Sequence, residues 1–134
     1  GISLFGSPVS ISRVETEGTR YCSRAFERAA KERALLWSEV PEGLDVLITH
    51  CPPLGHLCSK YFGDPVLAAR LASMTAPPRF HVFGHEHEYL GIDFDGKTVF
   101  MNVAQDEGLR SDPDGGGCPL IFDIEARETV EADG

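Results

Sequence analysis

Three histidines stand where short apolar runs of this chain end. His85 and His87 belong to the stretch "FGHEHEYLG", and His50 follows the apolar run "LDVLIT" and precedes two prolines. Residues two apart in extended backbone point to the same side of the chain, so the rings of His85 and His87 can face one point. Imidazole rings gathered at the rim of one sheet would suit Zn, Fe, Mn or Ni. A metal site is one interpretation of these residues, and a solvated polar loop is the other.

Other side chains near these histidines have weaker claims to a chemical role. His56, in the loop that follows the first histidine, either lines the same site or is a solvated loop residue. Cys51 is a candidate ligand, although a reduced thiol without that role is favoured. His81 lies inside an apolar run and is expected to be a core or surface histidine. Glu86 and Glu88 would alternate to the opposite side from the site, so we expect them at the solvated surface.

Length and charge narrow the class of protein. The chain has 134 residues, with 12 Lys and Arg against 21 Asp and Glu, a formal charge of −9. That length fits one domain, and an acidic body repels phosphate backbones, so nucleic-acid binding is not expected. A phosphate-bearing substrate would need a local positive element, which a metal ion would supply. No apolar run approaches the roughly 20 residues that span a bilayer, and the four cysteines form no C-x-x-C pair. We therefore expect a reduced, cytoplasmic protein without a membrane segment.

Apolar periodicity and turn signals predict strands that alternate with helices. The predicted strands cover residues 2–6, 44–49, 80–84 and 119–124, and residues 89–104 form a hairpin that turns at Asp95-Gly96. The predicted helices cover residues 21–38 and 65–76, the second with Asp64 as its N-cap and Pro65 at its first position. Residues 10–19 and 105–117 are interpreted as loops. This order favours an α/β layered domain over residues 1–126, followed by an acidic tail over residues 127–134, with ligands gathering where strands end.

Three segments together resemble a known family. The stretches "LDVLITHCPPLGH", "PPRFHVFGHEHEYLG" and "DGKTVFMNVA", in that order, are similar to the C-terminal half of calcineurin-like metallophosphoesterases, in particular the branch of metallophosphoesterase domain-containing phosphodiesterases. The resemblance covers residues 1–104, but the segment 9–34 matches poorly. It implies part of a four-layer αββα sandwich, with a mixed sheet and short helices.

The resemblance also implies a metal centre and its reaction. In that family two metal ions polarise a phosphate ester and generate the attacking hydroxide. Carried over by motif, His50 and His85 would bind the second metal and His87 the first, with Mn, Fe, Zn or Ni as the two divalent ions. Asn102 matches a family asparagine that is not a metal ligand. We assign Asn102 and His56 only a supporting or substrate-contacting role.

The carboxylate-bearing motifs of the family have no counterpart before His50. The family has Asp-x-His, Gly-Asp and Gly-Asn-His motifs there, whereas this region holds one aspartate, Asp45, and no histidine. We therefore expect the chain to be one part of a longer phosphoesterase, with partial or no metal occupancy and no activity alone. The proton-donating histidine would lie upstream. An apolar sheet edge or face would then need a partner, either the missing half of the domain or a second copy of this chain.

Three functions remain open at this point. The first is hydrolysis of a small phosphate ester, with a phosphodiester favoured as the substrate. The second is a non-catalytic module of the same fold that binds a protein partner, an interpretation motivated by the missing upstream ligands. The third is a globular domain whose histidines cluster by chance.

Overall fold

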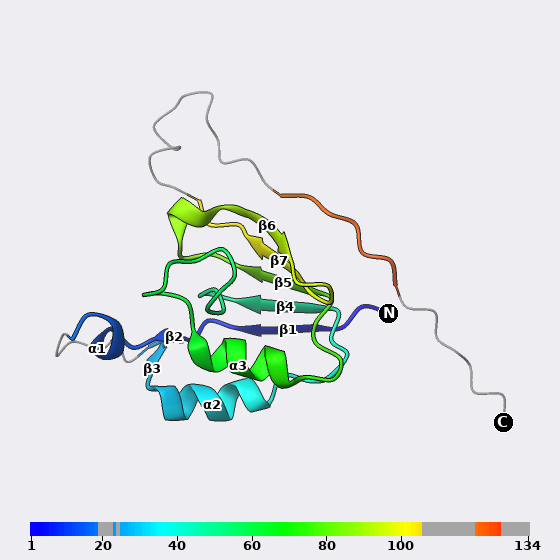
Figure 1. Cartoon of the computed structure of the whole chain (residues 1–134). Helices are drawn as coiled ribbons and strands as arrows, with labels where there is room; N and C mark the ends of the chain where they lie inside the picture. Colours follow the sequence, from blue (N-terminus) through cyan, green and yellow to red (C-terminus); the bar gives the residue numbers. More distant parts are fainter. Residues whose placement is uncertain (19–22, 24, 106–119, 127–134) are drawn as a thin grey trace.

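The fold is built around one five-stranded sheet with two helices packed against it (Figure 1). A computed structural model describes residues 1–18, 23, 25–105 and 120–126. In chain order the elements are β1 (Leu4–Ser7), β2 (Ser10–Ile11), α1 (Arg13–Thr16), β3 (Glu27–Arg28), α2 (Ala30–Ser38), β4 (Val46–Thr49), α3 (Pro65–Ser73), β5 (Phe80–Phe83), the 3-10 turn η1 (His87–Tyr89), β6 (Gly91–Phe94) and β7 (Val99–Asn102). None of the described helices is long and apolar enough to cross a membrane.

The sheet is mixed, as predicted. Its strand order is β1-β4-β5-β7-β6, with the first four strands parallel and β6 antiparallel to β7. The last pair is the predicted hairpin, and Gly96 in its turn has a φ of 96°, a conformation that favours glycine. The α/β class is therefore confirmed, and it agrees with a metallophosphoesterase-type fold.

Helices α2 and α3 cover one face of the sheet and enclose the core. Trp37 of α2 and Leu67 of α3 pack with the sheet residues Leu47, Phe83 and Phe100. These sheet residues share one face because side chains alternate along a strand. Burial of this apolar cluster is the main stabilising contribution to the fold.

Asp64 joins the two helices, and its predicted role as the N-cap of α3 is confirmed. Its side chain accepts a hydrogen bond from the Val66 backbone N–H at 2.9 Å, and Pro65 follows it as the first helical residue. The same carboxylate accepts hydrogen bonds from Arg33 Nε at 3.0 Å and from Trp37 Nε1 at 2.9 Å. Both charged groups are buried and compensate each other, and Arg33 also pairs with Glu15 Oε2 at 3.1 Å.

Three local predictions are wrong: the start of the first predicted helix, the interpretation of residues 10–19 as a loop, where β2 and α1 form instead, and the last strand. The helix expected over 21–38 begins only at Ala30, because Glu27–Arg28 pairs with Ser10–Ile11 as a short parallel ladder within the segment interpreted as a loop. Tertiary pairing here overrides local helix propensity. The strand expected over 119–124 does not form in residues 120–126. The acidic tail 127–134 and most of the loop 105–117 lie outside the described residues.

The second face of the sheet is apolar, and none of the helices in the described residues lies on it (Figure 1). By alternation and register, ten positions face this side, and all ten are apolar: Leu4, Gly6, Val46, Ile48, Phe80, Val82, Val99, Met101, Ile92 and Phe94. Leu4, Ile48, Ile92 and Phe94 are exposed, while Phe122 packs on Phe80 with ring centroids 5.3 Å apart. We call these ten positions the open face.

Candidate metal centre

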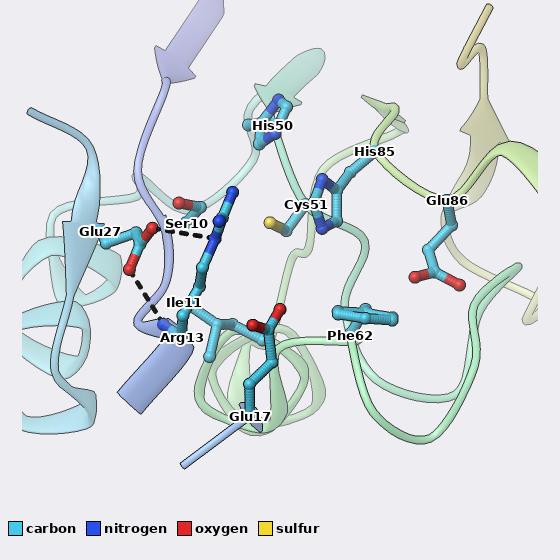
Figure 2. A pocket seen from close by; sticks show the side chains of 10 residues that line it. All are labelled: Ser10, Ile11, Arg13, Glu17, Glu27, His50, Cys51, Phe62, His85 and Glu86. Carbon is cyan, nitrogen blue, oxygen red and sulfur yellow. Dashed lines mark hydrogen bonds and ion pairs between the residues drawn. The ribbon is translucent and has the colours of Figure 1, made fainter. Parts of the chain in front are cut away.

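His50, Cys51 and His85 converge at one edge of the sheet. His50 follows β4 and His85 follows β5, and these strands are parallel neighbours, so their carboxyl ends meet at the same edge. The ligand atoms of His50, Cys51 and His85 all lie within 4.8 Å of one another. The rings of the two histidines have centroids 4.9 Å apart (Figure 2). The predicted convergence of His50 and His85 is therefore present in the structure.

The backbone holds the two histidine-bearing loops in this arrangement. The Gly84 N–H donates a hydrogen bond to the His50 carbonyl oxygen at 3.1 Å, which joins the loops directly. His85 has a φ of 73°, a left-handed conformation that is uncommon for a residue other than glycine. Such conformations cluster at functional sites because the surrounding structure must stabilise them.

The predicted ligand His87 lies apart from this cluster. It opens the turn η1, its side chain is exposed, and it does not belong to the group formed by His50, Cys51 and His85. The left-handed backbone at His85 ends the extended conformation. The prediction that the rings of His85 and His87 face one point depended on that conformation. Its role as a ligand of the first metal stays a prediction.

His56 lies away from the two clustered histidines. Its ring stacks on Phe100 at a centroid distance of 3.7 Å, and its Nδ1 is 2.8 Å from Asp93 Oδ2. The hydrogen bond from His56 lowers the pKa of Asp93. His56 thus joins its loop to β6, and it is absent from the lining of the pocket around His50 and His85.

Asn102 at the end of β7 supports the loop after β5. Its Nδ2 donates hydrogen bonds to the carbonyl oxygens of Glu86 at 2.8 Å and Leu57 at 3.2 Å, and its Oδ1 accepts one from the Ala104 N–H. A buried amide that satisfies several backbone groups fixes their positions. These contacts suit the supporting role predicted for Asn102.

The expectation of a solvated Glu86 is wrong. Its side chain is 8% exposed, and its Oε2 accepts a hydrogen bond from the Ser59 N–H at 3.1 Å. Simple alternation fails here because the left-handed backbone at His85 turns the following residue inward. Glu86 therefore lines the same pocket as His50 and His85.

His81 is a core histidine, and the Thr49 hydroxyl connects it by hydrogen bonds to the main chain of Cys51. It is fully buried, and its Nε2 lies 2.9 Å from Thr49 Oγ1. The Thr49 hydroxyl donates its proton to the Cys51 carbonyl oxygen at 2.7 Å, so it can only accept from His81. The Nε2 atom must carry the ring proton. Nδ1 is therefore unprotonated, and it has no hydrogen-bond partner among the described residues. Burial, with a smaller effect from nearby His56, lowers the pKa of His81 to about 3.

The pocket around the cluster has a volume of about 350 Å³ and an acidic lining. Ten residues line it: Ser10, Ile11, Arg13, Glu17, Glu27, His50, Cys51, Phe62, His85 and Glu86 (Figure 2). One guanidinium faces three carboxylates, a formal net charge of −2 that favours a bound cation.

Two of the clustered side chains have shifted pKa values. Burial in the pocket wall lowers the pKa of His85, and the neighbouring His50 lowers it further. His85 is therefore neutral at pH 7, which is the form that binds metals. Burial is also the largest cause that raises the pKa of the Cys51 thiol to about 11.

Sequence analysis did not predict that Arg13 and Glu27 line this pocket. The Arg13 N–H donates to Glu27 Oε2 at 2.9 Å, and Arg13 Nε lies 3.4 Å from Glu27 Oε1. Both residues belong to the segment 9–34, where the family resemblance is poor, and the pairing of β2 with β3 brings them together. No local pattern predicts such a contact between residues 14 apart.

Sequence comparisons relate the chain to metallophosphoesterase-domain proteins. The chain is 35% identical over 131 residues to UPF0046 protein T07D4.2 of Caenorhabditis elegans, covering 92% of this chain and 30% of that protein. It is 41% identical over 96 residues to UPF0046 protein C25E10.12 of the same organism, covering 66% of this chain and 33% of that protein. It is 40% identical over 72 residues to human metallophosphoesterase domain-containing protein 1, covering 51% of this chain and 22% of that protein. No protein-family model matches the chain.

These matches confirm the predicted relationship to the metallophosphoesterases. The chain is a relative of metallophosphoesterase domain-containing proteins, and it spans a third or less of the length of these three relatives. The donor set at the strand ends fits the divalent metal that such proteins use, because imidazole nitrogen and cysteine sulfur both bind transition metals. His50 and His85 would hold that metal.

Proposed function

We propose that this chain forms part of a metal-dependent phosphoesterase, with a phosphodiester of a small molecule as its substrate. The observation that carries the proposal is the convergence of His50 and His85 at the carboxyl ends of two parallel strands, in a pocket wide enough for a phosphate ester. The relationship to metallophosphoesterase-domain proteins supports the same reaction. Two divalent ions would polarise the ester and activate water.

The histidines, the glutamates and the arginine of the pocket would have different roles, set by their charge. Neutral imidazoles bind a cation without cancelling its charge, so the positive field reaches the substrate. Glu17 and Glu86 add negative charge that draws the cation into the pocket. Arg13 stands across the pocket from the histidines, where its guanidinium can contact a phosphate oxygen bidentately (Figure 2). Glu27 holds that guanidinium in place.

We further propose that the open face is covered by the rest of a metallophosphoesterase domain. The exposed positions of the open face, Leu4, Ile48, Ile92 and Phe94, form an apolar surface over which no described helix lies, and soluble proteins rarely leave such a surface uncovered. The chain also spans a third or less of its relatives. A second sheet packed there would complete the predicted sandwich and bring further metal ligands.

The test is complementation with the upstream part of a relative. We expect the chain, co-expressed with that part of the T07D4.2 protein, to co-purify with it and to hydrolyse an aryl phosphodiester in Mn²⁺. His85→Ala should abolish hydrolysis, whereas Lys97→Ala, at an exposed turn position, should not. Ile48→Lys on the open face should prevent assembly, and Leu35→Lys, the same kind of change at an exposed position of α2, should not.

Two results would contradict these proposals. A complex that keeps full hydrolysis with His85→Ala would remove the histidine site from the reaction. An assembled complex that binds metal but hydrolyses no phosphate ester would favour the non-catalytic, partner-binding module instead.

A further inference from the structure

We propose that Cys51 is a third metal ligand beside His50 and His85, so that this chain carries a His-Cys-His centre suited to zinc or another thiophilic ion. The inference rests on the histidine site of the proposed function and adds a ligand that the family motif does not contain. The ligand atoms of all three residues lie within 4.8 Å of one another. Tetrahedral zinc places neighbouring nitrogen and sulfur ligands roughly 3.3–3.7 Å apart, so the three side chains would need to move by about 1 Å to bind the ion together.

The loop after β4 presents the Cys51 sulfur to the histidines. Cys51 is 4% exposed and lines the pocket, with its sulfur directed into it (Figure 2). The Thr49 hydroxyl holds the Cys51 carbonyl oxygen at 2.7 Å. The Gly84 N–H holds the preceding carbonyl, that of His50, at 3.1 Å. These two hydrogen bonds hold the carbonyl groups of His50 and Cys51 in place, so the Cys51 side chain is preorganised as a ligand.

A thiolate would supply what two imidazoles lack. Neutral histidines leave the full charge of a divalent ion uncompensated in the pocket, whereas one thiolate reduces it by one unit. A bound cation deprotonates a coordinating thiol outright, so the metal replaces the thiol proton, which passes to solvent. Sulfur ligation favours zinc and cobalt over manganese or magnesium, which prefer oxygen.

Cys58 provides the matched comparison. It is the other described cysteine of this region and is half-buried, but its Sγ donates to the Pro53 carbonyl oxygen at 3.4 Å. It does not belong to the group of ligand atoms around His50. Substitution of Cys58 therefore removes a thiol without touching the proposed centre.

The experiment is Co²⁺ substitution in the 134-residue chain, followed by absorption spectroscopy. We expect a thiolate-to-cobalt charge-transfer band in the near ultraviolet for the unsubstituted chain and for Cys58→Ser. Cys51→Ser should lose the band and bind zinc about tenfold or more weakly in competition with a chelator. Thermal melting of each variant without metal establishes that the fold is intact, and Cys51→Ala serves as the second variant if serine destabilises the chain.

The outcomes separate this inference from the proposed function. A band that persists in Cys51→Ser, or cobalt bound with no band in the unsubstituted chain, would overturn the Cys51 ligand and leave the histidines in place. Failure of every variant to bind cobalt or zinc would overturn the centre itself. A cysteine-dependent band in a complemented domain without hydrolysis would overturn only the phosphoesterase proposal.

Discussion

Acidification should destabilise the chain through His81, which lies behind the candidate metal centre. The ring is fully buried, its Nε2 must donate to Thr49, and its Nδ1 has no hydrogen-bond partner among the described residues. Protonation would place a second N–H on Nδ1 and a positive charge on a ring that is fully buried and packs edge-on against Phe83 and Phe100. Neither ring accepts a conventional hydrogen bond, so the charged form is strongly disfavoured.

The sign and size of the effect follow from the pKa. The folded-state pKa of about 3 lies below the ordinary 6.5, so the unfolded chain binds the proton first as the pH falls. The stabilising contribution is complete above pH 6.5 and is lost between pH 6.5 and 3. The difference between 6.5 and about 3 corresponds to roughly 5 kcal/mol over that whole window. Between pH 6.5 and 4.5 the loss should be roughly 2 to 3 kcal/mol.

The assay is urea unfolding in EDTA at a series of pH values, with His81→Gln as the comparison. Glutamine keeps an N–H donor for Thr49 but does not titrate. Buried carboxylates such as Asp45 and Asp64 contribute to both proteins, so the difference between the two pH profiles isolates His81. We expect the unsubstituted chain to lose stability more steeply, by up to about 1.4 kcal/mol per pH unit.

Parallel pH profiles for the two proteins would refute this reasoning. So would a nitrogen NMR spectrum in which His81 carries its proton on Nδ1, because the Thr49 hydrogen bond requires it on Nε2. Thr49→Val offers an independent check, since it removes the acceptor. It should cost about 1–3 kcal/mol at pH 7 by leaving the His81 N–H unsatisfied.

Two further substitutions test how the fold is held together. Asp64→Asn should cost about 3 kcal/mol or more, because it removes the buried carboxylate from the guanidinium of Arg33, which is 1% exposed and would keep its ion pair with Glu15. Glu42→Gln, in an exposed ion pair, should cost under about 1 kcal/mol, and equal urea midpoints would contradict this contrast. Gly63→Ala should cost about 1–3 kcal/mol, because its Cβ would lie 2.6 Å from a cysteine sulfur and 2.7 Å from a main-chain carbon. Gly6→Ala meets nothing closer than 3.8 Å and should leave the melting temperature nearly unchanged, so equal losses at both glycines would be inconsistent with this packing.

The elements predicted correctly are those that local rules determine. Asp64-Pro65 begins α3 as a capping residue and a first-turn proline do in general, and Asp95-Gly96 turns the hairpin. The convergence of His50 and His85 followed from a topological rule, because adjacent parallel strands end at the same edge of a sheet. Their proximity could therefore be inferred without any knowledge of side-chain packing.

The parts that could not be predicted depend on contacts distant in sequence or on one unusual torsion. Nothing local marks Glu27 as a strand residue, since its partner Ser10 lies 17 positions earlier and the run around it is helix-like. The positive φ of His85 reversed the expected orientation of Glu86, which strict alternation would have placed in solvent. A single left-handed residue changes every orientation argument that passes through it.

The two walls of the pocket differ in how firmly the structure holds them, and this difference suits their proposed tasks. His50 and Cys51 follow a central strand, and His85 is joined to them through the Gly84 hydrogen bond. Arg13 lies on the opposite wall, at the start of the four-residue helix α1 that follows the two-residue strand β2, and 57% of its side chain is exposed. Glu27 is buried and orients the guanidinium, but solvent around Arg13 screens their ion pair, so Arg13 is held less firmly than the histidines. Metal ligands need fixed geometry, whereas a group that meets substrates of varied shape benefits from adaptability. The firmly held wall therefore suits the metal ligands of the proposed centre, and the less firmly held wall suits the proposed contact with phosphate.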